Sequence, residues 1–380
     1  MLASAEIGSD FNFGFGTSTI ITDTYQSSLL GKDNLPAGYH AVFTDSGRSA
    51  LRLVLKQLSI GDGNSALVPS YLCESVAEAL LREEINPIYY DVDTSLETSL
   101  DDILMRKAKD TKMILIMDYF GRHSNLDEYV PVLVSEGLNV IYDVSHSLFY
   151  RLQQPTDPVA AYVGSLRKLL PLPDGGIVFS KAISEPDCAY DLRANLEHAS
   201  LRTSAMIWKE AWLRNSHEPK PPFRELFIQA ESLLDQSDEI GLLSDVSRVM
   251  LKLIDFDFIV QRRRRNFLEL ADMSTDWPEG VTPVFASLRP EECPLGFPVI
   301  VDRRNDLKHF LIRNRVYPPI HWSIDASTFK EYPESIWLSE HILTLPCDHR
   351  YDAKDMRIIS ELILKWGNIR DKSRTKGVES

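Results

Sequence analysis

The chain has 380 residues, of which 44% are hydrophobic and 25% charged, a composition typical of globular rather than disordered proteins. Its length is sufficient for one large domain and a smaller one. The formal net charge of −14 disfavours nucleic acid or an anionic membrane as the main partner. An anionic small molecule is still compatible with this charge, because a local arginine or a helix N-terminus can bind a phosphate.

Cysteine usage and the N-terminal segment indicate the compartment. The cysteines show neither a CxxC spacing nor a metal-binding pattern with histidine, and they are Cys73, Cys188, Cys293 and Cys347. Residues 1–13 include two acidic side chains and lack the basic and apolar regions of a secretory signal. No apolar run of about 18 residues is present. We therefore expect a soluble, cytoplasmic protein without a metal site.

Between residues 40 and 180 the sequence alternates between strand and helix patterns. Short apolar runs predict strands over residues 41–43, 65–68, 87–92, 113–118, 138–142 and 176–180. The intervening segments have helical spacing over residues 49–58, 74–84, 100–108 and 126–136. Strands this apolar, separated by helices, predict a mostly parallel central sheet with helices on both faces.

The remainder of the chain changes character twice. Residues 184–272 have a mainly helical pattern, interrupted by a polar, proline-containing stretch at 215–222, and the run Arg262–Arg265 is interpreted as a solvated helix face with acidic partners. From about residue 280 the pattern is α+β, with strands at 298–301, 318–322 and 342–346, helices at 304–313 and 353–366, and a frayed tail from Asp371. We expect a large domain over 1–272, with an N-terminal arm and a helical insertion, and a small α+β domain over 273–380.

Two side chains suggest a Schiff-base enzyme. The strand at 138–142 runs into Asp143, which places a carboxylate at the edge where open α/β sheets bind ligands. Lys168 lies further along in Gly164–Lys168 and could approach the same pocket. Pyridoxal phosphate (PLP) needs a lysine for its aldehyde and an acid for its pyridine nitrogen.

A turn between strand and helix could bind the phosphate. Ser46, Gly47 and Arg48 follow the strand at 41–43, so backbone N–H groups and a hydroxyl can face a phosphate with help from the helix dipole. An ordinary N-cap in a tight turn is the alternative. The segment lacks the P-loop pattern, and no GxGxxG motif follows a strand.

Other side chains at the same edge have two interpretations each. His146 could hydrogen-bond the cofactor's phenolic oxygen, or it could be a satisfied turn histidine. Tyr71 could stack on the cofactor ring, although an aromatic residue after a strand is more often part of the core.

Together these segments resemble the DegT-like sugar aminotransferases of the aspartate aminotransferase superfamily, PLP transferase fold type I. The similarity covers most of residues 40–365. Its segments are Ser46–Leu51, Pro69–Tyr71, Asp143–His146, Lys168 with its spacing to Asp174–Gly176, and residues 296–301, 319–322 and 343–348.

The resemblance implies a role for each site residue. Lys168 would hold the cofactor covalently and move protons, Asp143 would pair with the pyridine nitrogen, and His146 would replace the family's usual glutamine. The phosphate would be held by Ser46, Gly47, Arg48 and Ser165. The family also implies a homodimer with active sites at the subunit interface.

The chain departs from the family pattern at three places. The stacking position aligns with Cys73 rather than Tyr71, and Asp118 replaces a usual histidine. An asparagine-containing loop that reaches the partner subunit has no clear counterpart between Asp191 and Ser247.

The functional prediction is a PLP-dependent aminotransferase. It would move an amino group from an amino-acid donor, glutamate, to a keto substrate, a nucleotide-linked keto sugar. The alternatives are a PLP-dependent lyase or dehydratase on the same scaffold and a non-catalytic PLP-binding protein. Neither nucleic acid nor a membrane is expected as a partner.

Overall fold

The computed structural model describes residues 6–13, 35–182, 192–214 and 222–378, with the backbone alone over 371–378. The chain divides into two compact units. The large unit spans Asp10–Phe256, and the small unit combines Met1–Ser9 with Asp257–Ser380. The predicted division into domains after residue 272 stays a prediction.

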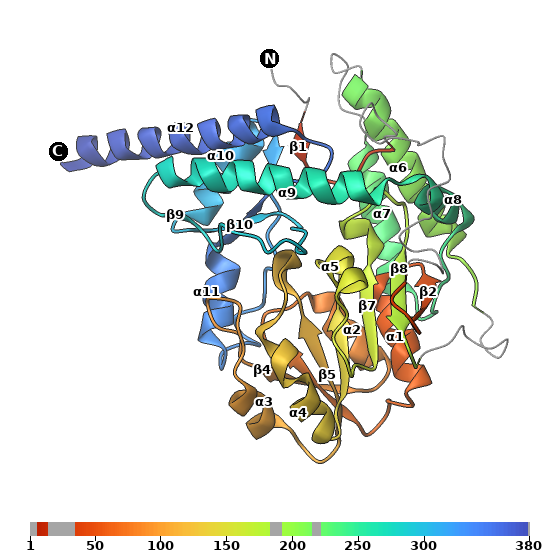
Figure 1. Cartoon of the computed structure of the whole chain (residues 1–380). Helices are drawn as coiled ribbons and strands as arrows, with labels where there is room; N and C mark the ends of the chain where they lie inside the picture. The colour runs from red at the N-terminus through yellow and green to blue at the C-terminus, as the bar shows by residue number, and fades with distance from the viewer. Residues whose placement is uncertain (1–5, 14–34, 183–191, 215–221, 379–380) are drawn as a thin grey trace. The chain divides into compact units, whose positions relative to one another are not determined.

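A seven-stranded sheet forms the centre of the large unit (Figure 1). Its strand order is β2-β8-β7-β6-β5-β3-β4. The neighbouring pairs from β4 through β7 are parallel, and β8 is antiparallel to both of its neighbours. The strands are β2 (His40–Thr44), β3 (Ser65–Pro69), β4 (Asn86–Tyr90), β5 (Thr111–Met117), β6 (Asn139–Asp143), β7 (Ala161–Ser165) and β8 (Gly176–Ser180).

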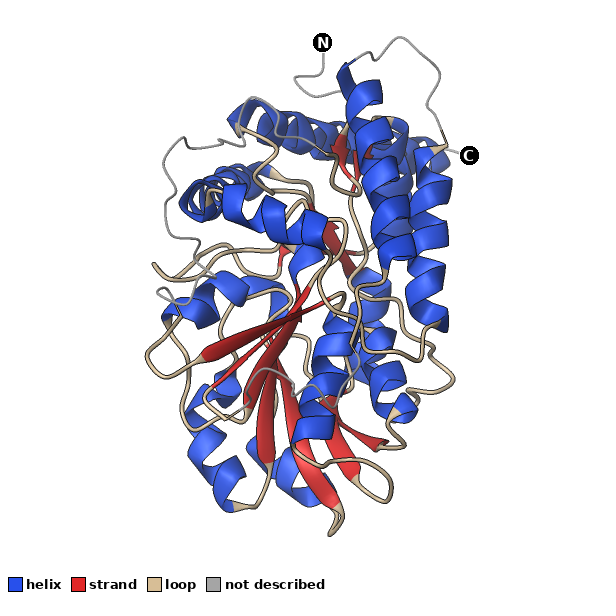
Figure 2. Cartoon of the chain, turned by 90° about the vertical axis from the view of Figure 1, so that its right-hand side faces the viewer, coloured by secondary structure: helices blue, strands red, loops and turns tan. Residues whose placement is uncertain are grey.

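Helices cover this sheet, as the view by secondary structure shows (Figure 2). Helix α1 packs against β7 and β8, α2 against β4, and α4 against β6. The helices are α1 (Gly47–Gln57), α2 (Glu74–Arg82), α3 (Leu100–Arg106), α4 (Val130–Ser135), α5 (Leu148–Gln153), α6 (Leu196–Arg214), α7 (Phe223–Gln236) and α8 (Asp245–Leu253). The fold class predicted from the sequence is confirmed, whereas β7 and α5 were not predicted.

The central strands are apolar because both faces of the sheet are covered. Every residue of β3 is buried, and β5 and β6 are exposed at only Lys112 and, in part, at Asn139. Parallel strands between two helical layers have this continuous hydrophobic pattern. The strands are therefore rigidly packed, and they carry the polar residues that follow them to defined positions.

The small unit contains two short sheets. One has the antiparallel order β12-β10-β9, and in the other β1 pairs in parallel with β11. Its strands are β1 (Ile7–Gly8), β9 (Val281–Pro283), β10 (Phe297–Val301), β11 (Val316–Tyr317) and β12 (Ile342–Leu345). Its helices are α9 (Phe256–Met273), α10 (Arg304–Arg313), α11 (Pro333–His341) and α12 (Ala353–Val378).

The predictions for two segments of this part of the chain are wrong. The strand expected over residues 318–322 is not formed, and β11 ends at Tyr317, because Pro318 and Pro319 have no N–H to donate. The helix expected to end at Trp366, with a frayed tail from Asp371, instead continues as α12 to Val378.

The arginine run in α9 also differs from the prediction. The Arg263 side chain is buried and donates to the carbonyls of Pro294 and Leu295. Arg262 and Arg264 likewise donate to backbone carbonyls. Because long arginine side chains can satisfy carbonyls left over by loops, these residues stabilise the small unit instead of forming a solvated face.

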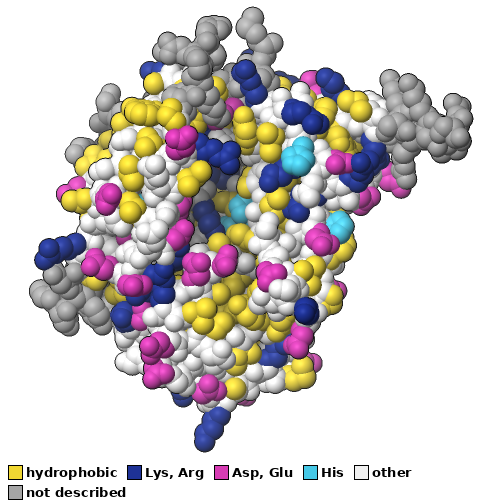
Figure 3. All heavy atoms as spheres, turned by 180° about the vertical axis from the view of Figure 1, so that it is seen from behind, with side chains coloured by type: hydrophobic (Ala, Val, Ile, Leu, Met, Phe, Trp, Pro, Cys, Tyr) yellow, Lys and Arg dark blue, Asp and Glu magenta, His cyan; other side chains and the backbone are white. Residues whose placement is uncertain are grey.

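The surface mixes charges of both signs. On the face drawn in Figure 3, acidic and basic side chains are interspersed with hydrophobic ones. Within the described ranges, no helix is both long and apolar enough to cross a membrane.

Gly176 permits a close contact that the fold depends on. A Cβ built at Gly176 would lie 2.0 Å from the Ser46 carbonyl oxygen. We expect Gly176→Ala to lower the free energy of unfolding by about 3 kcal/mol, because backbone would have to shift. Urea denaturation measures this. Gly61→Ala is the control, since the nearest atom there, the Glu83 carbonyl oxygen, lies at 3.7 Å; equal stability of the two variants would contradict the prediction.

Candidate active site

A cavity of about 400 Å³ opens at the C-terminal edge of the parallel strands in the large unit. The structure brings most of the predicted site residues to its wall. They are Ser46, Gly47, Arg48, Cys73, Asp143, Ser165 and Lys168. These residues come from segments far apart in the sequence, so the sheet topology, which places strand ends side by side, assembles the site.

Two predicted site residues do not line this cavity. Tyr71 is fully buried, and its ring lies 6.1 Å from that of Tyr119. His146 is also fully buried, and its Nδ1 accepts a hydrogen bond of 3.2 Å from the Phe120 N–H. The predicted contacts of these two side chains with the cofactor stay predictions, whereas Cys73 lines the cavity wall.

The N-terminus of α1 presents donors to the cavity. Ser46 is the N-cap, and its hydroxyl accepts from the Ser49 N–H. The first N–H groups of the helix, at Gly47 and Arg48, have no intrahelical acceptor. A Cβ at Gly47 would lie 3.2 Å from the Ser165 nitrogen, so glycine lets the turn approach the end of β7 closely. The N-cap and the phosphate-binding interpretations are thus compatible here.

Asp143 is fixed at the end of β6 by its local hydrogen bonds. Its Oδ1 accepts a 2.8 Å bond from the Ser145 N–H. The Ser145 hydroxyl accepts in turn from the Ser165 N–H, at 2.9 Å. This chain links the ends of β6 and β7 and therefore holds the carboxylate in one orientation beside the segment that carries Lys168.

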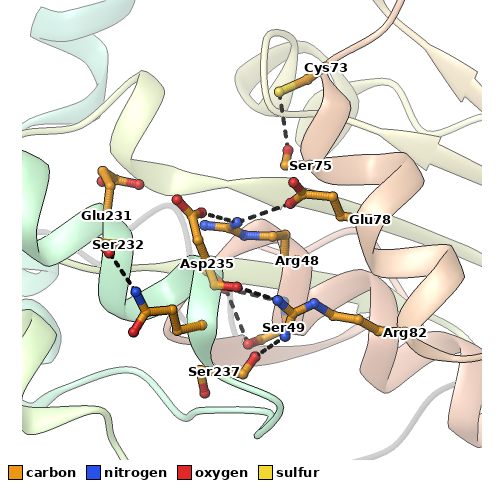
Figure 4. A network of polar contacts seen from close by, with 12 residues as sticks. Arg48, Ser49, Cys73, Ser75, Glu78, Arg82, Glu231, Ser232, Asp235 and Ser237 are labelled. Atoms are coloured by element: carbon orange, nitrogen blue, oxygen red, sulfur yellow. Dashed lines mark hydrogen bonds and ion pairs between the residues drawn. The ribbon is translucent and has the colours of Figure 1, made fainter. Parts of the chain in front are cut away.

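The cavity wall also includes charged residues to which the sequence gave no role, among them Glu78, Asp235, Arg167 and Glu231. Figure 4 shows the Arg48 side chain between two carboxylates, those of Glu78 and Asp235, at 3.5 and 2.5 Å. Arg167 lines the cavity and pairs with Glu231 of α7. Glu231 and Asp235 lie one helical turn apart in α7. This spacing places them on one face of the helix, but nothing in the sequence related that face to the cavity.

Asp118, noted above as a departure from the family, forms a buried ion pair. Its Oδ2 accepts from the Arg151 Nε at 2.6 Å and from the Ser147 hydroxyl at 2.7 Å. The side chains of Asp118 and Arg151 are both fully buried. Asp118 is not among the residues that line the cavity, so its carboxylate stabilises the loop after β5.

His198 makes stability depend on pH. Burial, and then the charge of Arg167, lowers the His198 pKa to about 3. Between pH 6.5 and 3 the unfolded chain binds a proton that the folded chain does not, so stability falls as the pH falls through this window, by up to about 1.4 kcal/mol per pH unit. We expect His198→Gln to reduce this slope between pH 6 and 4, as measured by urea denaturation. His309→Gln, at an exposed position, is the control; an unchanged slope in His198→Gln would refute the assignment.

The sheet and its edge define a fold type I transferase architecture. The solved structures that share it include a putative sugar aminotransferase, Spr1654 from Streptococcus pneumoniae, with a TM-score of 0.68, 14% identity and coverage of 97% of this chain and 100% of that one. Another is DesV from S. venezuelae, with a TM-score of 0.63, 18% identity and coverage of 86% and 85%. Residues 37–181 match the DegT/DnrJ/EryC1/StrS aminotransferase family. The family resemblance predicted from the sequence is thereby confirmed.

Curated relatives match over shorter stretches. A dTDP-4-dehydro-2,3,6-trideoxy-D-glucose 4-aminotransferase of Saccharopolyspora spinosa is 26% identical over 201 residues, which cover 52% of this chain and 50% of the relative. A UDP-N-acetyl-3-dehydro-alpha-D-glucosamine 3-aminotransferase of Acidithiobacillus ferrooxidans is 29% identical over 110 residues, 29% of this chain and 30% of the relative. The chain thus spans about half the length of the first relative, and less of the second.

Proposed function

We propose that the chain is a PLP-dependent aminotransferase that moves an amino group from an amino-acid donor, glutamate, to the keto group of a nucleotide-linked sugar. One observation carries this proposal: Lys168, Asp143 and the N-terminus of α1 line a single cavity. The names of the relatives support the substrate class, since two of them are aminotransferases of dTDP- and UDP-linked sugars.

The cavity residues fit PLP. Lys168 would hold its aldehyde carbon, and Asp143 its pyridine nitrogen. The N–H groups at the start of α1, with Ser46 and Ser165, would hold its phosphate, as helix N-termini do. When bound, PLP supplies an electron sink for the carbon that loses a proton. Structures of the Streptococcus pneumoniae relative in PLP and PMP forms support this cofactor.

The chain's own residues would manage the protons. The Lys168 Nζ takes a proton from the donor's Cα and returns one to the carbon that receives the amino group. The Asp143 carboxylate keeps a proton on the pyridine nitrogen, because an adjacent negative charge favours the protonated form. Apolar side chains of Leu115 and Val163 line the same cavity and reduce its water content.

We further propose a homodimer with shared active sites and a cytoplasmic location. The family resemblance supports the dimer, which light scattering during size-exclusion chromatography would test. The cysteines among the described residues, Cys73, Cys293 and Cys347, are all unpaired, and this supports a reducing compartment.

A spectral titration tests the function. The purified protein with PLP should show a visible absorption band, and glutamate should convert it to a pyridoxamine-type spectrum with release of 2-oxoglutarate. Addition of a keto-sugar nucleotide should then restore the band. A lyase would consume its substrate without needing glutamate, and a non-catalytic protein would keep its spectrum; either result would refute the proposal.

A further inference from the structure

A cluster of basic residues, Arg167, His198 and Arg202, lies beside Lys168, and its member Arg167 lines the cavity. Arg167 and Arg202 share one carboxylate, that of Glu231, whose Oε1 accepts from both guanidinium groups. The arginine side chains are 15% and 7% exposed, whereas that of Glu231 is 39% exposed. The cations are therefore held in place by the protein, and the carboxylate lies on the solvent side.

Several nitrogens in this cluster are buried without a hydrogen-bond partner among the described residues. They are the Nε atoms of Arg167 and Arg202 and both ring nitrogens of His198, whose side chain is fully buried. Buried donors without acceptors are rare and costly in folded proteins. The neutral His198 ring contributes one donor and one acceptor nitrogen, so the two arginine Nε–H groups are the main evidence that an acceptor is needed there.

The charges of Arg167, Arg202 and Glu231 also favour binding of a further anion. The pKa of Arg202 is lowered to about 10, first by burial and then by the charge of Arg167. Glu231 raises the pKa of Arg167 in spite of the burial of that residue, and a single carboxylate charge is thus shared by two guanidinium groups. Asp10, the other carboxylate near Arg202, lies 3.7 Å away and is 46% exposed.

We infer that Arg167 and Arg202 form an anion subsite of the cavity, in which Glu231 competes with an oxyanion of the substrate. Arg167 precedes Lys168 in the same 3-10 turn, so a ligand that pairs with its guanidinium lies next to the proposed reaction site. Guanidinium groups bind carboxylates and phosphates through paired N–H donors. This inference rests on the proposed function, because it assigns part of the same cavity to the substrate.

The oxyanion could be a carboxylate of the amino donor or a phosphate of the nucleotide-linked sugar. Both make the same contacts with guanidinium, and binding measurements distinguish them. Glutarate, which has no amino group to transfer, represents the donor, and thymidine diphosphate represents the phosphate source. Both probes are titrated by calorimetry against the protein saturated with PLP, so that the phosphate site at α1 is already filled.

Glu231→Gln removes the internal competitor and keeps the side-chain size. We expect it to tighten the binding of one of the two probes about three- to fivefold, the range that a partly exposed ion pair allows. Glu225→Gln is the matched control, because it makes the same charge change at an exposed position of α7. Unchanged or weaker binding of both probes by Glu231→Gln, relative to this control, would overturn the inference.

Arg202→Gln provides a second test with the opposite sign. It should weaken the same probe about tenfold, as loss of a charge-assisted pair does. Because Glu231 still pairs with Arg167 in this variant, adding Glu231→Gln should tighten binding less than Glu231→Gln does alone. If Glu231→Gln tightened probe binding by the same factor with and without Arg202→Gln, the shared subsite would be contradicted. If neither substitution changes probe binding while PLP still binds and glutamate still changes its spectrum, the subsite is refuted and the proposed function stands. If PLP does not bind at all, the proposed function itself is refuted.

Discussion

Lys168→Ala is expected to abolish the visible band of the bound cofactor and to lower the rate of transamination at least about a thousandfold. The variant has no amine to hold the aldehyde carbon, and it has no group to move the Cα proton. General acid–base catalysis by a single side chain contributes about 10² to 10⁴ in rate, and loss of the covalent link adds to this. The rate is measured as 2-oxoglutarate formed from glutamate, and the band by absorbance.

The control for this variant is another lysine of the large unit. Lys181 is half-exposed and pairs with Asp157 at 2.6 Å, away from the residues that line the cavity. Lys181→Ala should keep both the band and the rate near those of the unsubstituted protein. Full transamination by Lys168→Ala would contradict the central role of Lys168.

Asp118→Ala is expected to cause the largest loss of stability, about 3 to 5 kcal/mol in the free energy of unfolding. It would remove the main partner of the fully buried Arg151 guanidinium, and a buried charge without its partner is strongly destabilising. Asp127 would remain near Arg151, at 2.7 Å, but it cannot replace the two bonds that Asp118 accepts from Arg151. Urea denaturation measures the change.

Two comparisons separate this effect from a general loss of packing. Glu136→Ala breaks the surface pair with Lys107, in which the Glu136 side chain is 46% exposed, and should cost less than about 1 kcal/mol. Replacing both buried partners, Asp118→Leu with Arg151→Met, should be more stable than Asp118→Ala alone, because no fully buried charge is then left without its partner. Asp127 loses its pair with Arg151, but it is 21% exposed and keeps the hydrogen bond from the Tyr142 hydroxyl. A double variant that is less stable than the single one would show that the charge is not the cause.

Local pattern was sufficient to predict most of the large unit. The strands β3, β5 and β6 have the continuous apolar runs that a sheet covered on both faces requires. Polar residues such as Asp143 stand at the ends of these strands, where ligands bind in such sheets. The strand β7, Ala161–Ser165, was missed because its last residues, Gly164 and Ser165, were assigned to the segment that carries Lys168. The strand expected after Tyr317 failed because its two prolines cannot donate backbone hydrogen bonds.

The site residues that could be predicted lie in short segments whose residue types and spacing indicate a function by themselves. Ser46 with Gly47, and Lys168 before its Gly-Gly pair, have this property, and the structure places them on one cavity. The choice between Tyr71 and Cys73 depended on which side chain turns away from the core, a tertiary property. Glu231 reaches Arg167 from a helix more than 60 positions later, and no local pattern relates them.

Reduction of the PLP-loaded protein with borohydride, followed by peptide mass spectrometry, tests the central claim most directly. Borohydride fixes the cofactor to the lysine that holds it. The account predicts a single modified peptide, in which the cofactor is attached to Lys168. Modification of a different lysine, or none at PLP saturation, would contradict it.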